Sequence, residues 1–367
     1  MLKKFLVILI LKKSFKKYKY IFYNKKGYNL KLSNSSKLLI KNINMFKDKK
    51  VLFSGYFQDF LLKKIKNNFL KIHLQKYHYK KFVSKKNFKN LIYDSKFKKY
   101  SFKKINFVIY LWSKNKLENY FHMNKIFSKI LLNTKIIIIG ENNSGVNSVK
   151  NFFKSSIGFK KIKYGVKSSL YYGFLKKKIF FNKKKYYKQH QYNKKFFKFL
   201  PGVFGYKKID EASKYFVKNK KFKKFYKKIL DIGSGSGFLL ISLCDKFKYK
   251  KIVLSESCYT SFYCLKKNLK KNNINANPII SNIFSNIKEK FDLIISNPPI
   301  HENLKFSMKT ALNIIKESKK YLKKNGEIQI VSISSLSYFK NLKKIFKNCK
   351  IIKQNNLFKI YQSFNYY

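Results

Sequence analysis

The residues best suited to chemistry lie in a ten-residue stretch from Asp292 to His301, which reads D-L-I-I-S-N-P-P-I-H. Its apolar, β-branched beginning predicts a buried strand. Two consecutive prolines must end that strand, because proline donates no backbone hydrogen bond to a sheet. Pro299 also keeps Pro298 in an extended conformation. At this rigid turn the side-chain oxygen of Asn297 and the backbone carbonyl of Pro298 can accept two hydrogen bonds from one planar NH2 group.

A planar NH2 group of this kind occurs on adenine, cytosine, guanine and glutamine. Its nitrogen lone pair is delocalised into a ring or a carbonyl group. Two acceptors that hold both hydrogens favour a geometry in which the lone pair is free to attack an electrophile. Asn-Pro is also a common opening of a turn, so the stretch alone fits an ordinary strand end as well. A catalytic role for Asn297, Pro298 and Pro299 therefore depends on the residues upstream.

The upstream sequence predicts a strand, a glycine-rich turn and a helix in direct succession. The strand is Lys228–Ile232, the turn reads D-I-G-S-G-S-G from Asp231 to Gly237, and the helix is Phe238–Cys244. Such a unit binds nucleotides, because glycine permits positive φ and lets the backbone approach a ligand closely. Phe238 stands where a dinucleotide-binding fingerprint has glycine or alanine, which disfavours a dehydrogenase.

Two further polar residues follow predicted strands. Glu256 closes the run Lys251–Ser255 about 20 residues after the glycine turn, where a carboxylate would bind ribose hydroxyls. Asn282 follows the short strand Pro278–Ile280, in a position to touch the edge of an adenine ring. The glycine turn, the ribose acid and Asn-Pro-Pro occur in the order and spacing of a Rossmann-like methyltransferase.

The composition is that of a globular chain with an extreme basic charge. Of 367 residues 45% are hydrophobic, and 85 basic against 15 acidic residues give a formal net charge of +70. A charge of this size normally indicates nucleic-acid binding. The chain has no arginine, however, and is rich in residues with AT-rich codons, so drift in base composition explains much of the charge. The charge therefore permits RNA binding without establishing it, and attraction to RNA would depend strongly on salt.

Cysteine usage and the N-terminus indicate the compartment. Cys244, Cys258, Cys264 and Cys349 form no C-x-x-C pair and have no histidine at ligand spacing, so we expect reduced thiols and no bound metal. The first residues, M-L-K-K-F-L-V-I-L-I-L-K-K, resemble a signal peptide but lack a cleavage site. Their apolar part, Phe5–Leu11, is too short to span a bilayer. We therefore expect a cytoplasmic protein without a membrane partner.

The length suggests two domains after an N-terminal extension. We divide the chain into residues 1–32, the extension, and domains at 33–190 and 191–367. The first domain is expected to contain strands 51–56, 105–111 and 135–139 and helices 60–69 and 119–132. The second adds helices 259–271, 307–321 and 338–346, strand 327–333 and a closing pair, 350–353 and 358–361. Alternating strands and helices predict an α/β fold with mostly parallel sheets, the second with an antiparallel last strand.

The first domain shows the same alternation of strands and helices as the second domain but lacks its glycine turn and Asn-Pro-Pro residues. One glycine, Gly55, follows its first strand, and Trp112 and Ser113 stand where Asn-Pro-Pro would be. A duplicated domain that lost its ligand site fits these facts, and so do two unrelated α/β domains.

Residues 171–200 are dense in lysine and aromatics, which fits a β-hairpin or linker, or else a surface that stacks bases and holds phosphates. Pro201, the first proline of the chain, marks the boundary that follows.

Together these stretches closely resemble the bacterial ribosomal RNA small subunit methyltransferase C family over roughly residues 33–363. The resemblance rests on V-L-F-S-G-Y-F-Q-D at 51–59, W-S-K-N-K at 112–116, G-E-N-N-S-G-V at 140–146, L-P-G-V-F at 200–204, L-D-I-G-S-G-S-G at 230–237, S-N-I-F-S at 281–285 and I-I-S-N-P-P-I-H at 294–301. It implies tandem Rossmann-like class I methyltransferase domains. It also implies that S-adenosyl-L-methionine is the cofactor and that N2 of a guanine in 16S rRNA is methylated.

The resemblance further implies roles for individual residues. Those that would bind the cofactor are Asp231, Gly233, Gly235 and Gly237 around the methionine part, Glu256 at the ribose, Asn282 at the adenine and Asp210 closing over it. The guanine amino group would be held by Asn297 and Pro298, with Ile300 and His301 beside the substrate. This chain departs from the family at Ile300, where phenylalanine is usual, and at Asn143 and Asn147, where arginine is usual.

Two alternatives remain open. One is a methyltransferase of another planar amino group, such as adenine N6 or a protein glutamine, although the duplicated first half favours rRNA. The other is an RNA-binding assembly factor whose catalysis has decayed, against which intact Asp231, Glu256 and Asn297 argue. We expect small-subunit rRNA or the assembled small ribosomal subunit as the partner, and a monomeric protein.

Overall fold

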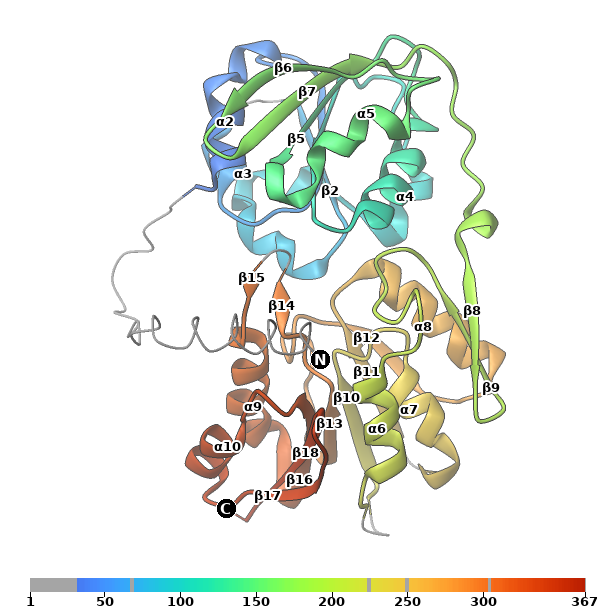
Figure 1. Ribbon diagram of the computed structural model, residues 1–367, viewed down its shortest axis with the longest axis vertical. Coiled ribbons are helices and arrows are strands. Elements are labelled where there is room, and N and C mark those ends of the chain that lie inside the picture. Colours follow the sequence, from blue (N-terminus) through green and yellow to red (C-terminus); the bar gives the residue numbers. More distant parts are fainter. Residues whose placement is uncertain (1–31, 67–68, 223–225, 248–250, 303–304, 367) are drawn as a thin grey trace, which may run out of the picture. The chain divides into compact units, whose positions relative to one another are not determined.

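The computed structural model of the protein describes residues 32–66, 69–222, 226–247, 251–302 and 305–366. The predicted extension, apart from Leu32, lies outside the described residues. From Leu32 onward the chain forms one compact unit that contains two large sheets. Each sheet has seven strands and is flanked by helices (Figure 1), which confirms the predicted α/β class with tandem Rossmann-like domains.

The second sheet carries most of the predicted site residues at its carboxyl edge. Its strand order is β12-β11-β10-β13-β16-β18-β17, and all its pairings are parallel except those of β18, which runs antiparallel to β16 and β17. The strands are β10 (Lys228–Ile232), β11 (Lys251–Glu256), β12 (Asn277–Ile280), β13 (Phe291–Ser296), β16 (Leu322–Ile333), β17 (Lys350–Gln354) and β18 (Phe358–Asn365). From β10 the chain adds β11 and β12 on one side and then returns to add β13 on the other, so the strand order reverses between β10 and β13, which is where open α/β sheets bind ligands.

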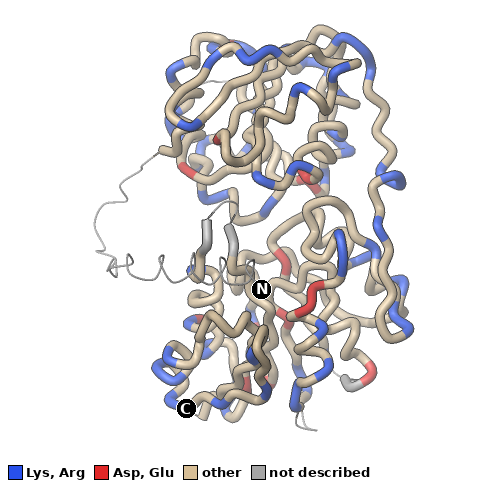
Figure 2. The backbone as a smooth tube through the Cα atoms, viewed as in Figure 1, with Lys and Arg blue, Asp and Glu red and all other residues tan. Residues whose placement is uncertain are grey.

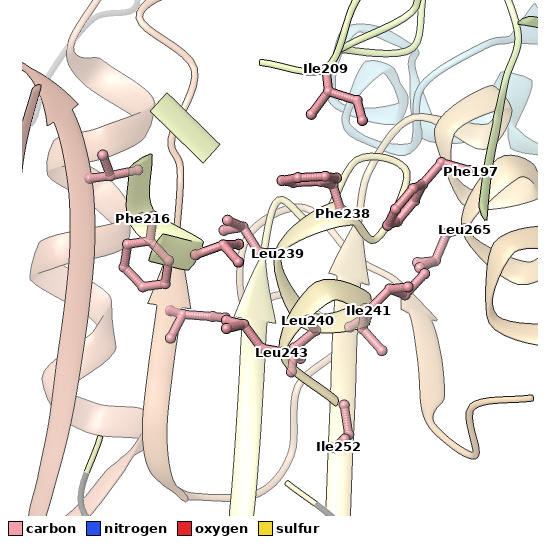
Figure 3. Packing of buried hydrophobic residues seen from close by; sticks show 14 of the residues in the cluster. Phe197, Ile209, Phe216, Phe238, Leu239, Leu240, Ile241, Leu243, Ile252 and Leu265 are labelled. Atoms are coloured by element: carbon pink, nitrogen blue, oxygen red, sulfur yellow. The ribbon is translucent and has the colours of Figure 1, made fainter. Parts of the chain in front are cut away.

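Helices cover both faces of this sheet, because successive strand residues point to opposite sides. On β13, Leu293 and Ile295 belong to one apolar cluster and Ile294 to another. The first cluster includes α6 (Glu211–Asn219), α7 (Phe238–Leu243) and α8 (Tyr259–Lys271), and the second includes α9 (Lys309–Tyr321) and α10 (Phe339–Phe346). Figure 3 shows the first cluster, in which the α7 side chains fill the space between the strands, Phe197 and Leu265.

The first sheet has the same topology as the second. Its order is β3-β2-β1-β4-β5-β7-β6, again with one antiparallel strand, β7, inserted between the last parallel strand and the edge. The strands are β1 (Val51–Gly55), β2 (Leu70–Leu74), β3 (Leu91–Tyr93), β4 (Phe107–Leu111), β5 (Lys135–Glu141), β6 (Lys160–Gly165) and β7 (Ser168–Phe174). Identical order and direction in both sheets favour duplication over two unrelated α/β domains.

Several elements differ from the sequence-based expectation. The predicted helix 60–69 is reduced to α3 (Leu61–Lys64), and the predicted helix 119–132 is α4 (Lys116–Phe127), which starts earlier because Asn115 caps it by accepting from the Glu118 N–H. Elements that were not predicted are α2 (Asn34–Lys41), α5 (Val149–Phe152), α6 and strands β2, β3, β6 and β7. All six residues of β6 are exposed, so it lacks the apolar alternation that identifies a strand.

Smaller elements complete the fold. The lysine- and aromatic-rich segment contains the hairpin of β8 (Lys188–Tyr192) and β9 (Lys195–Phe199), as one of the two interpretations expected. A short antiparallel pair, β14 (His301–Glu302) and β15 (Lys305–Phe306), follows the proline turn. Single 3-10 turns lie at Ile43–Met45, Tyr77–Phe82, Lys85–Asn90, Asp94–Lys99, Asn142–Ser144, Val146–Ser148, Lys183–Tyr186 and Cys244–Phe247.

Lysines are spread over every part of the described chain, with few acidic residues between them (Figure 2). This distribution agrees with a charge that arises from composition across the whole sequence. Within the described segments, no helix combines the length and apolar character needed to cross a membrane.

Candidate active site

The glycine turn between β10 and α7 is held against the end of β11. The backbone N–H groups of Gly233 and Ser234 both donate to the Ser255 carbonyl, at 2.9 and 3.0 Å, and Gly237 N–H donates to the Ser234 carbonyl at 2.8 Å. Gly233, Gly235 and Gly237 have φ of +73°, +58° and +85°, a region that other residues rarely adopt. The turn therefore requires glycine for conformational reasons at all three positions.

The three glycines differ in what surrounds them. A Cβ atom built on Gly233 or Gly235 would meet no heavy atom of the described chain within 4 Å, so these two positions border open space. On Gly237 the same atom would lie 2.6 Å from Leu265 Cδ1 and 2.9 Å from Ile241 Cδ1. Gly237 thus serves packing of α7, whereas Gly233 and Gly235 leave room for a ligand.

Asp231, on β10 just before the turn, is a fully buried carboxyl group with 0% exposure. Among the described residues, neither of its carboxylate oxygens has a hydrogen-bond partner. Burial, with a further contribution from the nearby Glu256 charge, raises the pKa of Asp231 to about 8. A buried acceptor without a donor is costly, so Asp231 is prepared for a donor or a cation that the described part of the chain does not supply.

Glu256 ends β11 and binds the adjoining backbone. Its carboxylate accepts from the N–H groups of Gly235 at 2.8 Å, Ser257 at 2.7 Å and Cys258 at 2.6 Å. Burial raises the pKa of Glu256, and these three backbone hydrogen bonds oppose that rise. The carboxylate therefore joins the glycine turn to the loop that follows β11.

Asn282 lies in the loop after β12, where its side chain is exposed. The next residue, Ile283, has φ of +54°, which is uncommon for a β-branched residue. Its carbonyl accepts from the hydroxyls of Ser255 at 3.0 Å and Ser281 at 2.8 Å, and these contacts hold the strained turn. No residue pattern indicates this strain, which fixes the backbone beside Asn282.

Asn297 follows β13 at the neighbouring strand end. The Ser296 hydroxyl donates to the Ile232 carbonyl at 2.8 Å and thereby ties the end of β13 to β10. The Asn297 amide nitrogen donates to Asp210 Oδ2 at 2.9 Å and to Ser213 Oγ at 2.8 Å. After it, Pro298 is buried, Pro299 exposed and Ile300 half-buried, while the His301 side chain lies outside the described residues.

Most of the predicted site residues therefore meet at the carboxyl ends of β10 to β13. Asp210 caps α6 by accepting from Ser213 N–H at 2.8 Å and also contacts Asn297, and its expected place over the cofactor stays a prediction. Ser213 was not predicted. Its signal in the sequence is its place three residues after an aspartate, the spacing at which an N-cap side chain meets the helix backbone.

A segment of the first domain contacts the loops that carry Glu256 and Asn282. Tyr77 N–H donates to the Ser257 carbonyl at 2.7 Å, and Tyr259 N–H donates to the Gln75 carbonyl at 3.0 Å, which forms an antiparallel bridge. The Tyr77 hydroxyl also lies 3.4 Å from Asn286 Oδ1, and the Asn286 amide in turn donates to the Ile280 carbonyl at 2.7 Å. The first domain thus supports two sides of the predicted cofactor site.

At the carboxyl end of β1 in the first sheet, the neighbouring backbone leaves no room beside the glycine. A Cβ atom on Gly55 would lie 2.2 Å from the Leu111 carbonyl oxygen, in contrast to the open space at Gly233 and Gly235. The Trp112 ring is buried and donates from Nε1 to the Ser144 carbonyl at 3.2 Å. Ser113, beside it, donates to Asn119 Oδ1.

Two family profiles match the chain and together span most of it. The "Methyltransferase small domain" profile matches residues 194–362, and the "Methyltransferase small domain N-terminal" profile matches residues 36–190. Ribosomal RNA small subunit methyltransferase C of Buchnera aphidicola subsp. Schizaphis graminum is 39% identical over 334 residues, covering 90% of this chain and 98% of the relative. The chain belongs to the ribosomal RNA small subunit methyltransferase C family. The protein of that name from Photorhabdus laumondii is 30% identical over 90% of this chain.

The fold of this family member also matches a solved structure over both domains. A T. thermophilus 16S rRNA N2 methyltransferase, solved in complex with AdoMet and guanosine, superposes with a TM-score of 0.74 and covers 92% of this chain and 93% of its own. Its sequence identity is 16%, so the likeness establishes the shared tandem fold. The predicted family and fold are therefore confirmed.

The residues at the second sheet suit S-adenosylmethionine, the cofactor expected for this methyltransferase family. The space beside Gly233 and Gly235 admits a ligand against the backbone, and the unpaired Asp231 carboxylate suits a positively charged ligand with N–H donors. The Glu256 carboxylate lies at the same strand ends and joins the glycine turn through the Gly235 N–H. The open space and the acidic groups around it fit an adenosyl amino acid.

The contrast between the glycines gives a testable prediction. Gly235→Ala should weaken S-adenosylmethionine binding more than Gly237→Ala does, because its methyl group enters the open space of the cradle. Gly237→Ala should instead lower the free energy of unfolding by about 1 to 3 kcal/mol more than Gly235→Ala, through overpacking against Leu265 and Ile241. Calorimetric titration and urea unfolding of the two variants measure these effects. Equal losses in both assays would contradict the assignment.

Proposed function

We propose that this protein methylates N2 of a guanine in small-subunit ribosomal RNA with S-adenosyl-L-methionine as donor, by direct in-line transfer. The observation that carries the proposal is the pairing of β10 with β13, which sets the Asn-Pro-Pro turn beside an open glycine cradle. The full-length similarity to ribosomal RNA small subunit methyltransferase C supports the same substrate class.

The chain contributes chiefly by positioning. The cofactor, when bound, supplies a methyl group that is already electrophilic because it is attached to a sulfonium. Asn297 Oδ1 and the Pro298 carbonyl hold the two hydrogens of the guanine amino group, and Pro299 keeps that carbonyl in place. Holding both reactants in line converts an encounter of two molecules into a single oriented step. No strong base is needed, because the methylated nitrogen loses its proton readily to water.

The remaining site residues are assigned to the cofactor and the base. Asp231 and the backbone of the glycine turn hold the methionine part, Glu256 the ribose and Asn282 the adenine edge. Ile300 and His301 follow the turn directly and lie against the guanine. Asp210 closes over the cofactor from the start of α6, where it also contacts Asn297.

Ile300 supports a second prediction. The aliphatic side chain contacts a base less strongly than an aromatic ring, since stacking of a base on an aromatic residue contributes about 1 to 3 kcal/mol. Ile300→Phe should therefore lower KM for the RNA substrate about five-fold or more, with little change in kcat. Steady-state methylation kinetics measure both constants. An unchanged or higher KM would place Ile300 away from the target base.

For residues 33–190 we propose a supporting role toward residues 191–367. The bridge between Gln75–Tyr77 and Ser257–Tyr259 holds the loop that carries Glu256, and Tyr77 reaches the loop that carries Asn282. The lack of space beside Gly55, the glycine that follows the first strand, fits a domain that has lost its own cofactor site. Its many lysines would also attract RNA.

The partner proposed here is small-subunit rRNA, either free or in the assembled small subunit. We further propose that the protein acts as a monomer in the cytoplasm, where small-subunit rRNA is processed. Its four cysteines are unpaired, which suits a reducing compartment.

The proposed reaction is tested by incubating purified protein with isotope-labelled S-adenosylmethionine and unmodified small ribosomal subunits, followed by nucleoside analysis of the RNA. N2-methylguanosine is the expected product. N6-methyladenosine, or label in a ribosomal protein, would move the activity to another planar amino group. Cofactor binding without transfer of label would leave an assembly factor that has lost catalysis.

A further inference from the structure

The side-chain amide of Asn297 is bound on one side by the first turn of α6. Its nitrogen donates to Asp210 Oδ2 at 2.9 Å and to Ser213 Oγ at 2.8 Å. Asp210 lies 87 residues and Ser213 84 residues away in the sequence, so these contacts exist only in the folded chain. Both hydrogens of the amide thus have acceptors within the protein.

These contacts fix which end of the amide faces the ligand. A carboxylate can only accept hydrogen bonds, so the amide must present its NH2 end to Asp210. Its carbonyl oxygen is then directed away from α6. A rotation of the amide by half a turn would bring that oxygen against the Asp210 carboxylate and would lose the hydrogen bond to this charged group, whereas the Ser213 hydroxyl can either accept or donate.

The first turn of α6 is itself well anchored. Asp210 Oδ2 also accepts from Ser213 N–H at 2.8 Å, as an N-cap. Ile209, Ala212 and Phe216 are buried in the apolar cluster, and Figure 3 shows Ile209 and Phe216 on the side of α7. The acceptor pair therefore rests on a helix that the core holds in place, and it can impose an orientation on Asn297.

We propose that Asp210 and Ser213 are positioning residues that turn Asn297 so that its oxygen, not its nitrogen, meets the target amino group. This inference rests on the proposed function, because only a substrate that donates NH2 hydrogens needs that orientation. It gives Asp210 a role at the substrate amino group, in addition to the place over the cofactor that the family resemblance implies.

The variant Asp210→Asn separates orientation from structure. Asparagine is as good an N-cap as aspartate, so α6 and the fold should remain stable. An asparagine amide, however, can pair with Asn297 in either orientation, so the directional preference is lost. With small ribosomal subunits as substrate, kcat should fall about five- to ten-fold, the difference between a charge-assisted and a neutral hydrogen bond. The dissociation constant for S-adenosylmethionine should not change.

Glu211→Gln is the matched control. It removes one negative charge at the same helix end, and Glu211 pairs with Lys214 and Lys208, not with Asn297. Its kcat should equal that of the wild type. If Asp210→Asn also retains wild-type kcat, or if it weakens cofactor binding instead, the orientation role is overturned.

A reciprocal exchange provides the sharper test. Asn297→Asp alone places two carboxylates together and should lose activity. In the double variant Asp210→Asn with Asn297→Asp, the new amide donates to the new carboxylate, whose second oxygen can accept from the substrate. The double variant should therefore be more active than Asn297→Asp alone. Absence of this rescue would overturn the inference, whereas a wild-type protein that forms no N2-methylguanosine would instead refute the proposed function.

Discussion

Asn297→Ala is expected to lower kcat for guanine methylation by about 100- to 1000-fold, the usual cost of removing one preorganised hydrogen-bonding group from a transition state. The amide oxygen accepts one of the two hydrogens whose capture frees the nitrogen lone pair. Without it the amino group stays conjugated with the ring and poorly aligned with the methyl donor. Cofactor affinity should be preserved, because Asp231, Glu256 and the glycine turn do not depend on Asn297.

The measurement is single-turnover methylation of small ribosomal subunits together with calorimetric titration of the cofactor. Asn313→Ala serves as the control, since Asn313 is exposed on α9 and the same atoms are removed far from the strand ends. Full activity in Asn297→Ala would exclude the proposed grip on the amino group.

Asp231→Asn is expected to weaken S-adenosylmethionine binding roughly 10- to 100-fold at pH 8, through loss of hydrogen bonds to a charged group. In the free protein burial raises the pKa of Asp231 to about 8. A cationic ligand beside the carboxylate favours its ionised form and so lowers this pKa in the complex. Affinity of the wild type should therefore fall as pH drops below about 8, and the variant should lose this dependence. A wild-type affinity that is constant between pH 6 and 9 would contradict the role of Asp231.

The Asp231→Asn variant, which should weaken cofactor binding, should stabilise the fold of the ligand-free protein. The folded-state pKa of Asp231 lies above the ordinary value of 3.8, so the folded chain keeps a proton that the unfolded chain loses. Stability from this group is present at low pH and is lost as pH rises toward about 8. Asp231→Asn should thus raise the melting temperature at pH 8 while it weakens cofactor binding.

Asp292→Asn serves as a control, because it should change the melting temperature at pH 8 in the opposite direction. Burial alone would raise the pKa of Asp292, but hydrogen bonds from Lys323 and from the backbone of Lys228 and Lys227 outweigh it and lower that pKa. Its contribution is present at neutral pH and is lost in acid, so Asp292→Asn should lower the melting temperature at pH 8. Thermal unfolding of both variants without ligand tests the pair, and a lower melting temperature for Asp231→Asn would contradict the argument.

The strands and site of the second domain could be predicted because the site residues directly follow apolar runs that are typical of buried strands. Glycines follow the run Lys228–Ile232, and prolines follow Asn297 after the run that ends at Ser296. The same residues therefore indicate both the end of a strand and a predicted site. Glu256 was found by its distance from the glycine turn, and Asn282 by its place directly after a predicted strand. Since parallel strands bring their carboxyl ends to one edge, correct strands sufficed to bring these residues together.

The missed features depend on contacts that sequence spacing does not encode. β6 is a lysine-rich edge strand that is recognisable only by its pairing with β7. Asp210 was found through the resemblance, but its contact with Asn297 joins residues that are far apart in the chain, and its partner Ser213 carried no motif. The bridge from Gln75–Tyr77 is made by backbone atoms, whose contacts leave no residue-type signal.

A crystal structure with S-adenosylhomocysteine and guanosine would show whether Asn297 and Pro298 hold a guanine amino group. Guanine N2 is expected within hydrogen-bond distance of both Asn297 Oδ1 and the Pro298 carbonyl oxygen, with the Asn297 nitrogen still on Asp210. A guanine whose amino group lies elsewhere, or an Asn297 whose nitrogen faces the base, would contradict it.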